Sequence, residues 1–341
     1  MPIGRKQSFC DLVWLARHGM VKTKKRSRMS RVLKRDGKQA GKQLLGLRIA
    51  GAVSRPFRYR GMQPMAWRWG RYFSSDNKVI VQLEGGRIWV HLNDGYWVKL
   101  VLPGYEYEAE VGALLRRLLD ASNQTAFLDC GANIGYWSVV ASSVLPKKRV
   151  FAVEASSHTF ARLVENASLN ADRFGLLQSA LWSTNGEELQ IGTSRRGHAG
   201  NSVVSADGTP TEFVRSVTID SLVSQIFPEV DCRLIIKLDV EGAEIRALQG
   251  AVETIAGRNP LFIYEDHATD HEHLTTRFVF EELGYRVFWP GEAGTLTEIR
   301  SIHELTSIKQ EAHRGYNFVA VGGTGPLLPL LIAASGTGRQ R

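Results

Sequence analysis

The sequence has few of the features that mark secreted, membrane-spanning or unfolded proteins. Its 341 residues include only three cysteines, which are too far apart for a disulfide framework and lack the paired spacing of a zinc site: Cys10, Cys130 and Cys232. No apolar run approaches the roughly 20 residues that a membrane-spanning helix requires, and no signal-peptide pattern follows the first charges. Because 43% of the residues are hydrophobic and 23% charged, we expect a folded protein. The few, widely spaced cysteines indicate a reducing compartment, so we expect the protein to be cytoplasmic with free thiols.

Acidic residues are scarce at the start of the chain. The first sixty residues hold 17 Lys and Arg against 2 Asp and Glu, whereas the whole chain carries a net charge of +9. We interpret residues 1–60 as a basic arm that is flexible or forms an amphipathic helix. Contact with an anionic membrane, which would make the protein peripheral to a membrane, and contact with RNA are the alternatives to a solvated arm.

The remaining chain divides into three parts. Residues 61–110 are predicted to form a small β-hairpin region, because glycine and asparagine turns separate three short alternating segments: Val79–Leu83, Arg87–His91 and Trp97–Leu102. Residues 111–321 alternate apolar strands with amphipathic helices, which predicts an α/β doubly wound, mostly parallel sheet. Its seven expected strands are Ala126–Asp129, Val150–Glu154, Leu176–Ala180, Leu234–Asp239, Leu261–Glu265, Tyr285–Phe288 and Phe318–Val321. We interpret residues 322–341 as a loosely held tail.

The clearest chemical signal is a strand that runs into a glycine turn, Asp129-Cys130-Gly131-Ala132-Asn133-Ile134-Gly135. Gly131 permits the tight turn, and Gly135 would let a ligand approach the N-terminus of the next helix. The following strand ends at Glu154, where a carboxylate can accept hydrogen bonds from both hydroxyls of a ribose. The alternative for Glu154 is a charge that stabilises a helix start.

Two further features refine this pocket. Ser179 and Ala180 leave room for an adenine ring at the end of the third strand, although close strand packing explains small residues equally well. The turn has the spacing Asp-x-Gly-x-x-x-Gly, which differs from the Gly-x-Gly-x-x-Gly of dinucleotide sites and places a nicotinamide oxidoreductase last among the alternatives.

Five stretches together resemble the FkbM-type S-adenosylmethionine-dependent methyltransferases: Asp129–Ser138, Phe151–Ala155, Val217–Leu222, Ile235–Glu244 and Leu248–Ala251. The resemblance implies a class I methyltransferase (Rossmann-like) fold, S-adenosyl-L-methionine as cofactor, and methyl transfer to a hydroxyl. The residues expected to bind the cofactor are Asp129, Gly131, Asn133, Gly135, Glu154, Ser179, Ala180 and Asp239. The sequence departs from the family at Cys130 and at Glu154-Ala155, where Glu-Pro is usual.

Methyl transfer to an alcohol needs a group that removes the hydroxyl proton. Asp239 closes a buried strand at the ligand edge of the sheet and is our first choice for this base or for orienting the substrate. Lys237 could pair with an acid or orient the substrate. Glu241 also points to this edge, or else it is an ordinary acid in the first turn of a helix.

The next strand supplies the rival base. It ends in Glu265-Asp266-His267, and His267 is the close second because histidine titrates near neutral pH. The run from Glu265 to His273 resembles a metal site, but polar residues commonly crowd at helix starts, so we predict no metal. A polar loop, Thr193–Ser205, could cover an acceptor, and Tyr136 and Trp137 could form a flat wall.

The leading hypothesis is an O-methyltransferase acting on a glycan, a lipid-linked sugar or a small polyhydroxylated metabolite. The alternatives are an RNA methyltransferase that uses the basic arm and a non-catalytic, cofactor-binding scaffold at a membrane surface. The catalytic domain is not basic and lacks an Asn/Asp-Pro-Pro-aromatic signature, which argues against nucleic acid.

Overall fold

An eight-stranded sheet forms the centre of the computed structural model, in the order β13-β12-β14-β11-β10-β4-β5-β6. The structure describes residues 32–335 except 58, 60–61, 75, 120–123, 193–210, 230, 268, 292–294 and 311–314. The strands are β4 (Thr125–Cys130), β5 (Val150–Glu154), β6 (Gly175–Gln178), β10 (Arg233–Leu238), β11 (Leu261–His267), β12 (Arg286–Pro290), β13 (Leu296–Ile299) and β14 (Gly315–Val321). All seven predicted strands are present, and β13 adds an unpredicted eighth at the edge.

The sheet is mostly parallel, as predicted. Strand β10 pairs in parallel with β4 and β11, and β5 pairs in parallel with β4 and β6. Only the distal strands reverse: β14 is antiparallel to both β11 and β12, and β12 is antiparallel to β13. The carboxyl ends of β4, β5, β10 and β11 therefore meet at one edge, where such sheets bind ligands.

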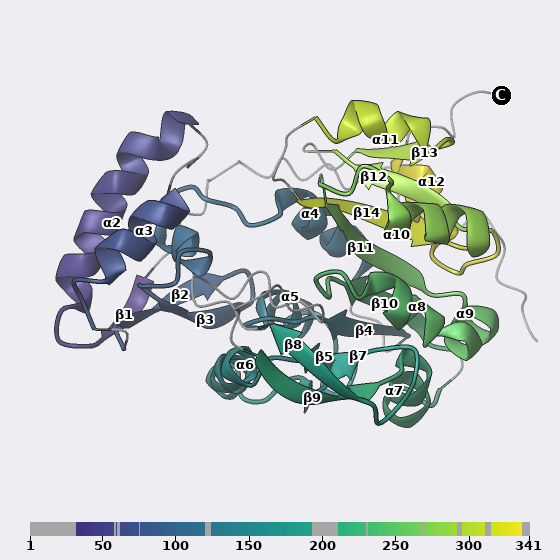
Figure 1. The fold of residues 1–341 in the computed structure, drawn as a ribbon, viewed down its shortest axis with the longest axis horizontal. Coiled ribbons are helices and arrows are strands. Elements are labelled where there is room, and N and C mark those ends of the chain that lie inside the picture. The colour runs from purple at the N-terminus through teal and green to yellow at the C-terminus, as the bar shows by residue number, and fades with distance from the viewer. Residues whose placement is uncertain are drawn as a thin grey trace, which may run out of the picture.

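Helices cover both faces of the sheet because its inner strands are apolar on both sides (Figure 1). One face packs against α4 (Ala109–Leu118), α5 (Tyr136–Ala141), α6 (Ser157–Leu169) and α12 (Leu328–Ala334). The other packs against α7 (Ile219–Ile226), α8 (Glu244–Gln249), η3 (Phe278–Glu282) and α11 (His303–Ile308). Two short helices, α9 (Val252–Arg258) and α10 (Leu274–Arg277), complete this part.

The N-terminal residues that are described form a separate small layer. Strands β1 (Val32–Asp36), β2 (Lys78–Leu83) and β3 (Gly86–His91) make an antiparallel sheet, accompanied by α2 (Ala40–Ser54), η1 (Arg55–Phe57) and α3 (Met62–Gly70). Leu44 and Leu47 of α2 are buried. Residues 32–57 therefore differ from the predicted arm, because an apolar stripe fixes α2 in place; residues 1–31 lie outside the described part.

Three further segments differ from their predictions. The expected third strand of the hairpin region is the 3-10 helix η2 (Trp97–Val101), since the Asp94 carboxylate accepts the backbone N–H groups of Tyr96 and Trp97 and begins a helical turn. The described part of the predicted tail contains α12, which buries Leu331. A small sheet of β7 (Ala180–Leu181), β8 (Glu188–Gly192) and β9 (Thr211–Val217) was not predicted.

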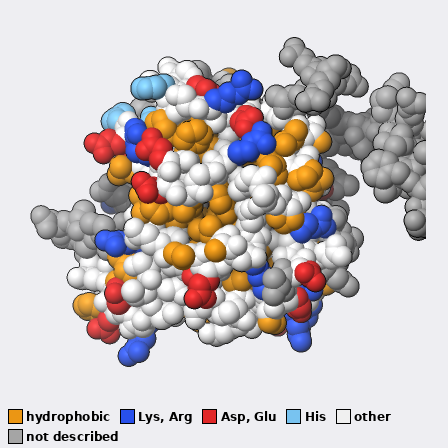
Figure 2. Space-filling model, turned by 90° about the vertical axis from the view of Figure 1, so that its right-hand side faces the viewer, with side chains coloured by type: hydrophobic (Ala, Val, Ile, Leu, Met, Phe, Trp, Pro, Cys, Tyr) orange, Lys and Arg blue, Asp and Glu red, His pale blue; other side chains and the backbone are white. Residues whose placement is uncertain are grey.

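The thiols, the helices and the surface of the described residues relate to three further features of the sequence: its cysteines, its apolar runs and its charges. Cys130 and Cys232 are buried and not joined in a disulfide. None of the described helices combines the length and apolar character that crossing a bilayer requires. On the face opposite the N-terminal layer, apolar side chains lie among charged residues of both signs (Figure 2).

Candidate functional site

A cavity of about 860 Å³, measured up to its open mouth, lies at the carboxyl edge of β4, β5, β10 and β11. It is lined by all the residues predicted to bind the cofactor except Gly135, and by all the predicted catalytic residues except His267. The structure thus brings together most of the predicted site from four separate strands.

The glycine turn after β4 is fixed by close backbone contact. Gly131 has φ +78°, and a Cβ there would lie 1.8 Å from the carbonyl oxygen of Asp239. The N–H groups of Gly131 and Ala132 both donate to the carbonyl of Val153 at 2.9 Å. Glycine is therefore required at 131 to hold the ends of β4, β5 and β10 together.

Gly135 packs tightly against the next helix. It has φ +86°, and a Cβ there would lie 2.6 Å from Leu163 Cδ1 of α6. Gly135 also does not line the cavity. The backbone conformation of Gly135 and its packing against α6 both favour glycine, and the role of this residue in admitting a ligand stays a prediction.

Glu154 closes β5 inside the cavity and is nearly buried, with 7% of its surface exposed. Asn133 N–H donates to its Oε2 at 2.9 Å, and Ser156 N–H donates to its Oε1 at 3.0 Å. Burial raises the pKa of Glu154 to about 7, while these two hydrogen bonds oppose the rise. The carboxyl group is therefore fixed in place and titrates near neutral pH.

Lys237 is the buried cation of the cavity. Its Nζ bonds Asp239 Oδ2 at 2.7 Å, and on the neighbouring strand Lys237 pairs in register with Asp129. Burial alone would lower the pKa of Lys237, but the surrounding carboxylates, above all Asp239, outweigh it and raise this pKa. Burial raises the pKa of Asp129. Lys237 and a 2.5 Å hydrogen bond from Ser138 Oγ oppose this rise.

Two more carboxyl groups share this electrostatic environment. Burial raises the pKa of Glu265, and the nearby charges of Asp239 and Glu108 raise it further, well above its ordinary value. Burial likewise raises the pKa of Glu108, and Lys237 opposes that rise. Glu108 was missed in the sequence because it precedes α4 in an unremarkable acidic stretch.

An aromatic wall closes the cavity on the side of the N-terminal layer. Tyr136 and Trp137 take part in it, as predicted, and Tyr96, Trp97 and Tyr107 join them. Trp97 Nε1 donates to the Asn133 side-chain oxygen at 2.9 Å. The three additional aromatics were missed because Trp97 was predicted to begin a strand, and Tyr96 and Tyr107 flank that strand within the predicted hairpin region.

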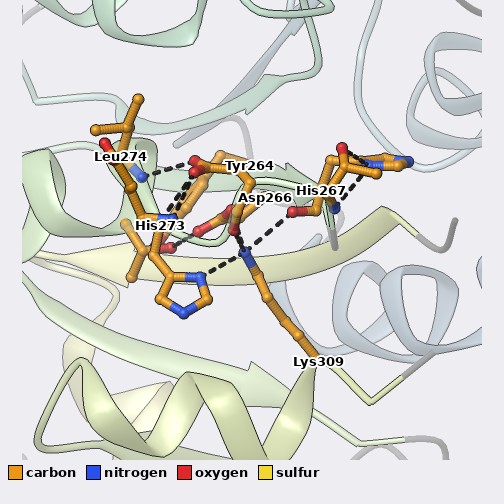
Figure 3. Close-up of polar contacts among 10 residues, drawn as sticks. Tyr264, Asp266, His267, His273, Leu274 and Lys309 are labelled. Atoms are coloured by element: carbon orange, nitrogen blue, oxygen red, sulfur yellow. Dashed lines mark hydrogen bonds and ion pairs between the residues drawn. The ribbon is translucent and has the colours of Figure 1, made fainter. Parts of the chain in front are cut away.

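His267 does not belong to the cavity. It is exposed at the end of β11, where its Nδ1 lies 2.8 Å from Thr269 Oγ1 (Figure 3). The adjacent Asp266 is buried and forms an ion pair with Lys309, and it also accepts a hydrogen bond from Thr276 (Figure 3). The structure thus separates the rival base from the predicted reaction centre.

Asp270 and His273 of the metal-like run have structural partners. Asp270 accepts the backbone N–H groups of Glu272, His273 and Leu274 and so begins α10. His273 Nδ1 lies 2.8 Å from Lys309 Nζ. Among the described residues, no group of His, Cys, Asp and Glu side chains has an arrangement suited to a metal ion.

Three other polar residues complete the account. Glu241 lines the cavity mouth, is exposed and has φ +51°. Glu244 accepts the N–H groups of Val240 and Gly242, which makes it a turn-stabilising residue. Asp220 caps α9 rather than its own helix, since it accepts the N–H groups of Glu253 and Thr254. The predicted covering loop, Thr193–Ser205, lies outside the described residues.

Known proteins resemble this chain mainly over the sheet that builds the cavity. Residues 129–287 match the model of the methyltransferase FkbM domain family. Over 156 residues the chain is 31% identical to the hexuronic acid methyltransferase AglP of Haloferax volcanii, an alignment that covers 46% of this chain and 62% of the relative. The chain therefore spans about three fifths of the length of that curated relative.

Solved structures resemble the chain more distantly. A methyltransferase FkbM from Methylobacillus flagellatus is 18% identical, with 58% of this chain and 44% of that chain covered and a TM-score of 0.37. TYW2 of M. jannaschii in complex with AdoMet is 12% identical, with 72% and 84% covered and a TM-score of 0.37. Because these TM-scores are low, the class I methyltransferase fold rests on the strand order and the family match.

Proposed function

We propose that this chain, which carries a methyltransferase FkbM domain at residues 129–287, is an O-methyltransferase acting on a glycan, a lipid-linked sugar or a small polyhydroxylated metabolite. Its cofactor is S-adenosyl-L-methionine. The observation that carries the proposal is a single cavity that joins the nearly buried carboxyl group of Glu154 to the charged group around Lys237 and Asp239. Such a cavity can hold a nucleoside at one end and a reacting hydroxyl at the other.

The chemistry of the donor set fits this cofactor. Each oxygen of Glu154 accepts one backbone N–H group, and its remaining lone pairs can accept two ribose hydroxyls. Ala180 and Leu181 offer apolar contacts for a flat base. Asp129 and Asp239 line the same cavity, where carboxylates suit the positive charges of a sulfonium and an ammonium group.

The charged group supplies the chemistry that an alcohol acceptor needs. The bound cofactor provides an electrophilic methyl group on a positively charged sulfur. We assign the removal of the hydroxyl proton to Asp239, whose carboxylate is held in place by Lys237 at 2.7 Å. Burial and the neighbouring carboxylates raise the pKa of Glu265, which favours its protonated form, and a protonated carboxyl group can donate a hydrogen bond to the acceptor. Glu241 lies at the mouth, where it can orient the acceptor.

A second cavity favours a saccharide as the acceptor. It has about 1,430 Å³ of empty space, open solvent included, and shares Tyr107, Tyr136 and Trp137 with the first cavity. Aromatic rings can pack against the apolar face of a sugar ring, while neighbouring polar side chains bond its hydroxyls. A longer glycan could therefore lie in the second cavity while one of its hydroxyls reaches the first.

The charges of the second cavity argue against RNA. Its charged lining residues are Glu84, Glu106 and Arg116, and Arg116 lies 3.3 Å from Glu84. Nucleic-acid sites are dominated by cations that neutralise phosphates, which this lining does not provide. The similarity to a protein named hexuronic acid methyltransferase also supports a sugar acceptor.

A transfer experiment tests the proposal. The full chain is incubated with S-adenosylmethionine that carries a trideuterated methyl group, together with separated glycan, lipid-linked saccharide, small-metabolite and RNA fractions of a cell extract. We expect mass spectrometry to find the label on a hydroxyl of a saccharide or polyhydroxylated product. Label only in RNA would support the RNA alternative, and cofactor binding without transfer to any fraction would support the scaffold.

A further inference from the structure

Helix α2 is apolar on two opposite sides. Its inward side buries Leu44 and Leu47, whereas Leu45, Ile49 and Val53 follow at intervals of four residues on the outward side. These three outward side chains are 61%, 59% and 70% exposed. A surface helix ordinarily turns polar residues outward, so this second apolar stripe marks a face that contacts something other than water.

Helix α3 and the turn after it extend the stripe. Met65, Trp69 and Tyr72 are 37%, 40% and 81% exposed. The two helices are joined at this face, because a Cβ at Gly46 of α2 would lie 2.9 Å from the ring of Trp69. We name Leu45, Ile49, Val53, Met65, Trp69 and Tyr72 the α2–α3 face.

The stretch of sequence that contains α2 and α3 is basic. Between Asp36 and Asp76 the sequence contains eight Lys and Arg and no acid. Lys42 and Arg68 are exposed on the two helices, and Arg68 shares a shallow hollow with Met65 and Trp69. The opposite face of the molecule instead mixes charges of both signs among its apolar side chains (Figure 2).

We propose that the α2–α3 face binds the surface of a membrane that contains anionic lipids. Exposed aliphatic side chains insert at the boundary of the acyl chains, and Trp and Tyr prefer the level of the headgroups. The surrounding cations are attracted to anionic headgroups. The basic character of this stretch, with Lys42 and Arg68 exposed on the two helices, is what favours a lipid surface over a second copy of this chain, because two such faces would repel each other.

Membrane binding by the α2–α3 face does not depend on the proposed methyl transfer, but it would affect where that transfer takes place. Helix α2 is tied to η2 through Arg48, whose Nε donates to the carbonyl of Val101 at 3.4 Å. Trp97 of η2 lines the cofactor cavity. Attachment through α2 would therefore hold the cavity near the membrane, where a lipid-linked acceptor would be presented.

Vesicle flotation tests the proposal with the full chain. Vesicles contain phosphatidylcholine alone or about 30% phosphatidylglycerol. The test variant is Leu45→Gln/Ile49→Gln/Val53→Gln, which keeps good helix formers in α2. Its matched control is Val252→Gln/Leu274→Gln/Leu330→Gln, at positions that are 63%, 48% and 43% exposed outside the α2–α3 face.

We expect the wild type and the control to float with the anionic vesicles, and the α2 variant to bind them at least about tenfold more weakly. Replacing both Lys42 and Arg68 by Gln should weaken anionic binding by about fivefold per charge and leave binding to neutral vesicles unchanged. Unchanged melting temperatures show that the variants fold.

Other outcomes overturn the proposal. If the wild type does not float, or if the α2 variant floats as well as the wild type, the α2–α3 face is not the membrane contact. Sedimentation equilibrium without lipid addresses the second copy. A dimer that the α2 variant abolishes would assign the face to self-association instead.

Discussion

At the scale of single residues, the cavity depends on carboxyl groups whose charge costs free energy to bury. Glu154 offsets that cost with two backbone hydrogen bonds, and Asp239 offsets it with the buried ammonium of Lys237. These groups differ in what they can do. Glu154 is held as a hydrogen-bond acceptor, whereas Asp239 sits beside a fixed cation where an acceptor hydroxyl could approach.

The raised pKa of Glu154 predicts pH-dependent cofactor binding. Because this pKa is about 7, the carboxylate that accepts ribose hydroxyls dominates above neutral pH and is lost as the pH falls through 7. The dissociation constant of S-adenosylhomocysteine should therefore rise about tenfold between about pH 8 and about pH 6. Calorimetric titration measures it.

Glu154→Gln is the matched control for that dependence. It should weaken binding by about tenfold or more at pH 8, because a charged acceptor is lost. It should also remove most of the change with pH, since the amide does not titrate. A wild-type dissociation constant that stays constant across this range would contradict the ribose role of Glu154.

Asp239→Asn tests the proton acceptor. We expect kcat to fall by about a hundredfold or more, because an amide cannot take the hydroxyl proton. The dissociation constant of S-adenosylhomocysteine should change far less. Glu241→Gln, at the exposed mouth, should cost much less activity than Asp239→Asn. Near-normal turnover by Asp239→Asn with unchanged cofactor binding would refute the assignment.

At the scale of elements, the site depends on strand ends meeting without intervening side chains. Gly131→Ala would drive a Cβ to within 1.8 Å of the Asp239 carbonyl, so β4 and β10 would have to separate. We expect a lower melting temperature and lost cofactor binding. Gly186→Ala is the control, because Gly186 has a similar φ of +80° but no atom within 4 Å of the added Cβ.

The control isolates the backbone conformation from the clash. Gly186→Ala should cost only about 1 kcal/mol of unfolding free energy and leave cofactor binding intact. Thermal melts and calorimetry of both variants measure the difference. Equal effects of the two substitutions would show that the contact with Asp239 does not matter.

The sequence predicted those elements whose apolar pattern is set by the sheet itself. Strands β4, β5 and β10 are mostly apolar, and each has an acid at or next to its carboxyl end: Asp129, Glu154 and Asp239. The apolar pattern therefore predicted the strands, and the acids predicted most of the cavity. The packing of helix α2 was not predicted, because the high positive charge of residues 1–60 favoured a solvated arm over a helix with buried leucines. Segment 97–102 was predicted to be a strand because its apolar residues alternate. In the structure, the hydrogen bonds of Asp94 begin a helical turn there instead.

At the scale of the whole molecule, the cavity is completed by the N-terminal half. Tyr96, Trp97 and Tyr107 contribute to its aromatic side, although the family match begins only at Asp129. The hydrogen bond from Trp97 to Asn133 links η2 to the glycine turn. The region that matches the family model therefore does not contain the whole cavity, which is why the motifs alone did not predict Tyr96, Trp97 and Tyr107.

Trp97→Phe tests that link. An aromatic ring is kept, but the side-chain oxygen of the half-buried Asn133 loses the N–H donor. We expect a loss of about 1 kcal/mol of unfolding free energy, measured by urea denaturation, and weaker cofactor binding. Tyr72→Phe, on an exposed ring, should change neither quantity. If Trp97→Phe is as stable as the wild type, the hydrogen bond between Trp97 and Asn133 does not link η2 to the glycine turn energetically.

The most direct test of the central claim is a crystal structure of the full chain with S-adenosylhomocysteine and a methylated saccharide product. The account predicts ribose hydroxyls within hydrogen-bond distance of Glu154 and the thioether sulfur facing the product oxygen beside Asp239. A nucleoside bound elsewhere, or a product oxygen remote from Asp239 and Glu265, would contradict it.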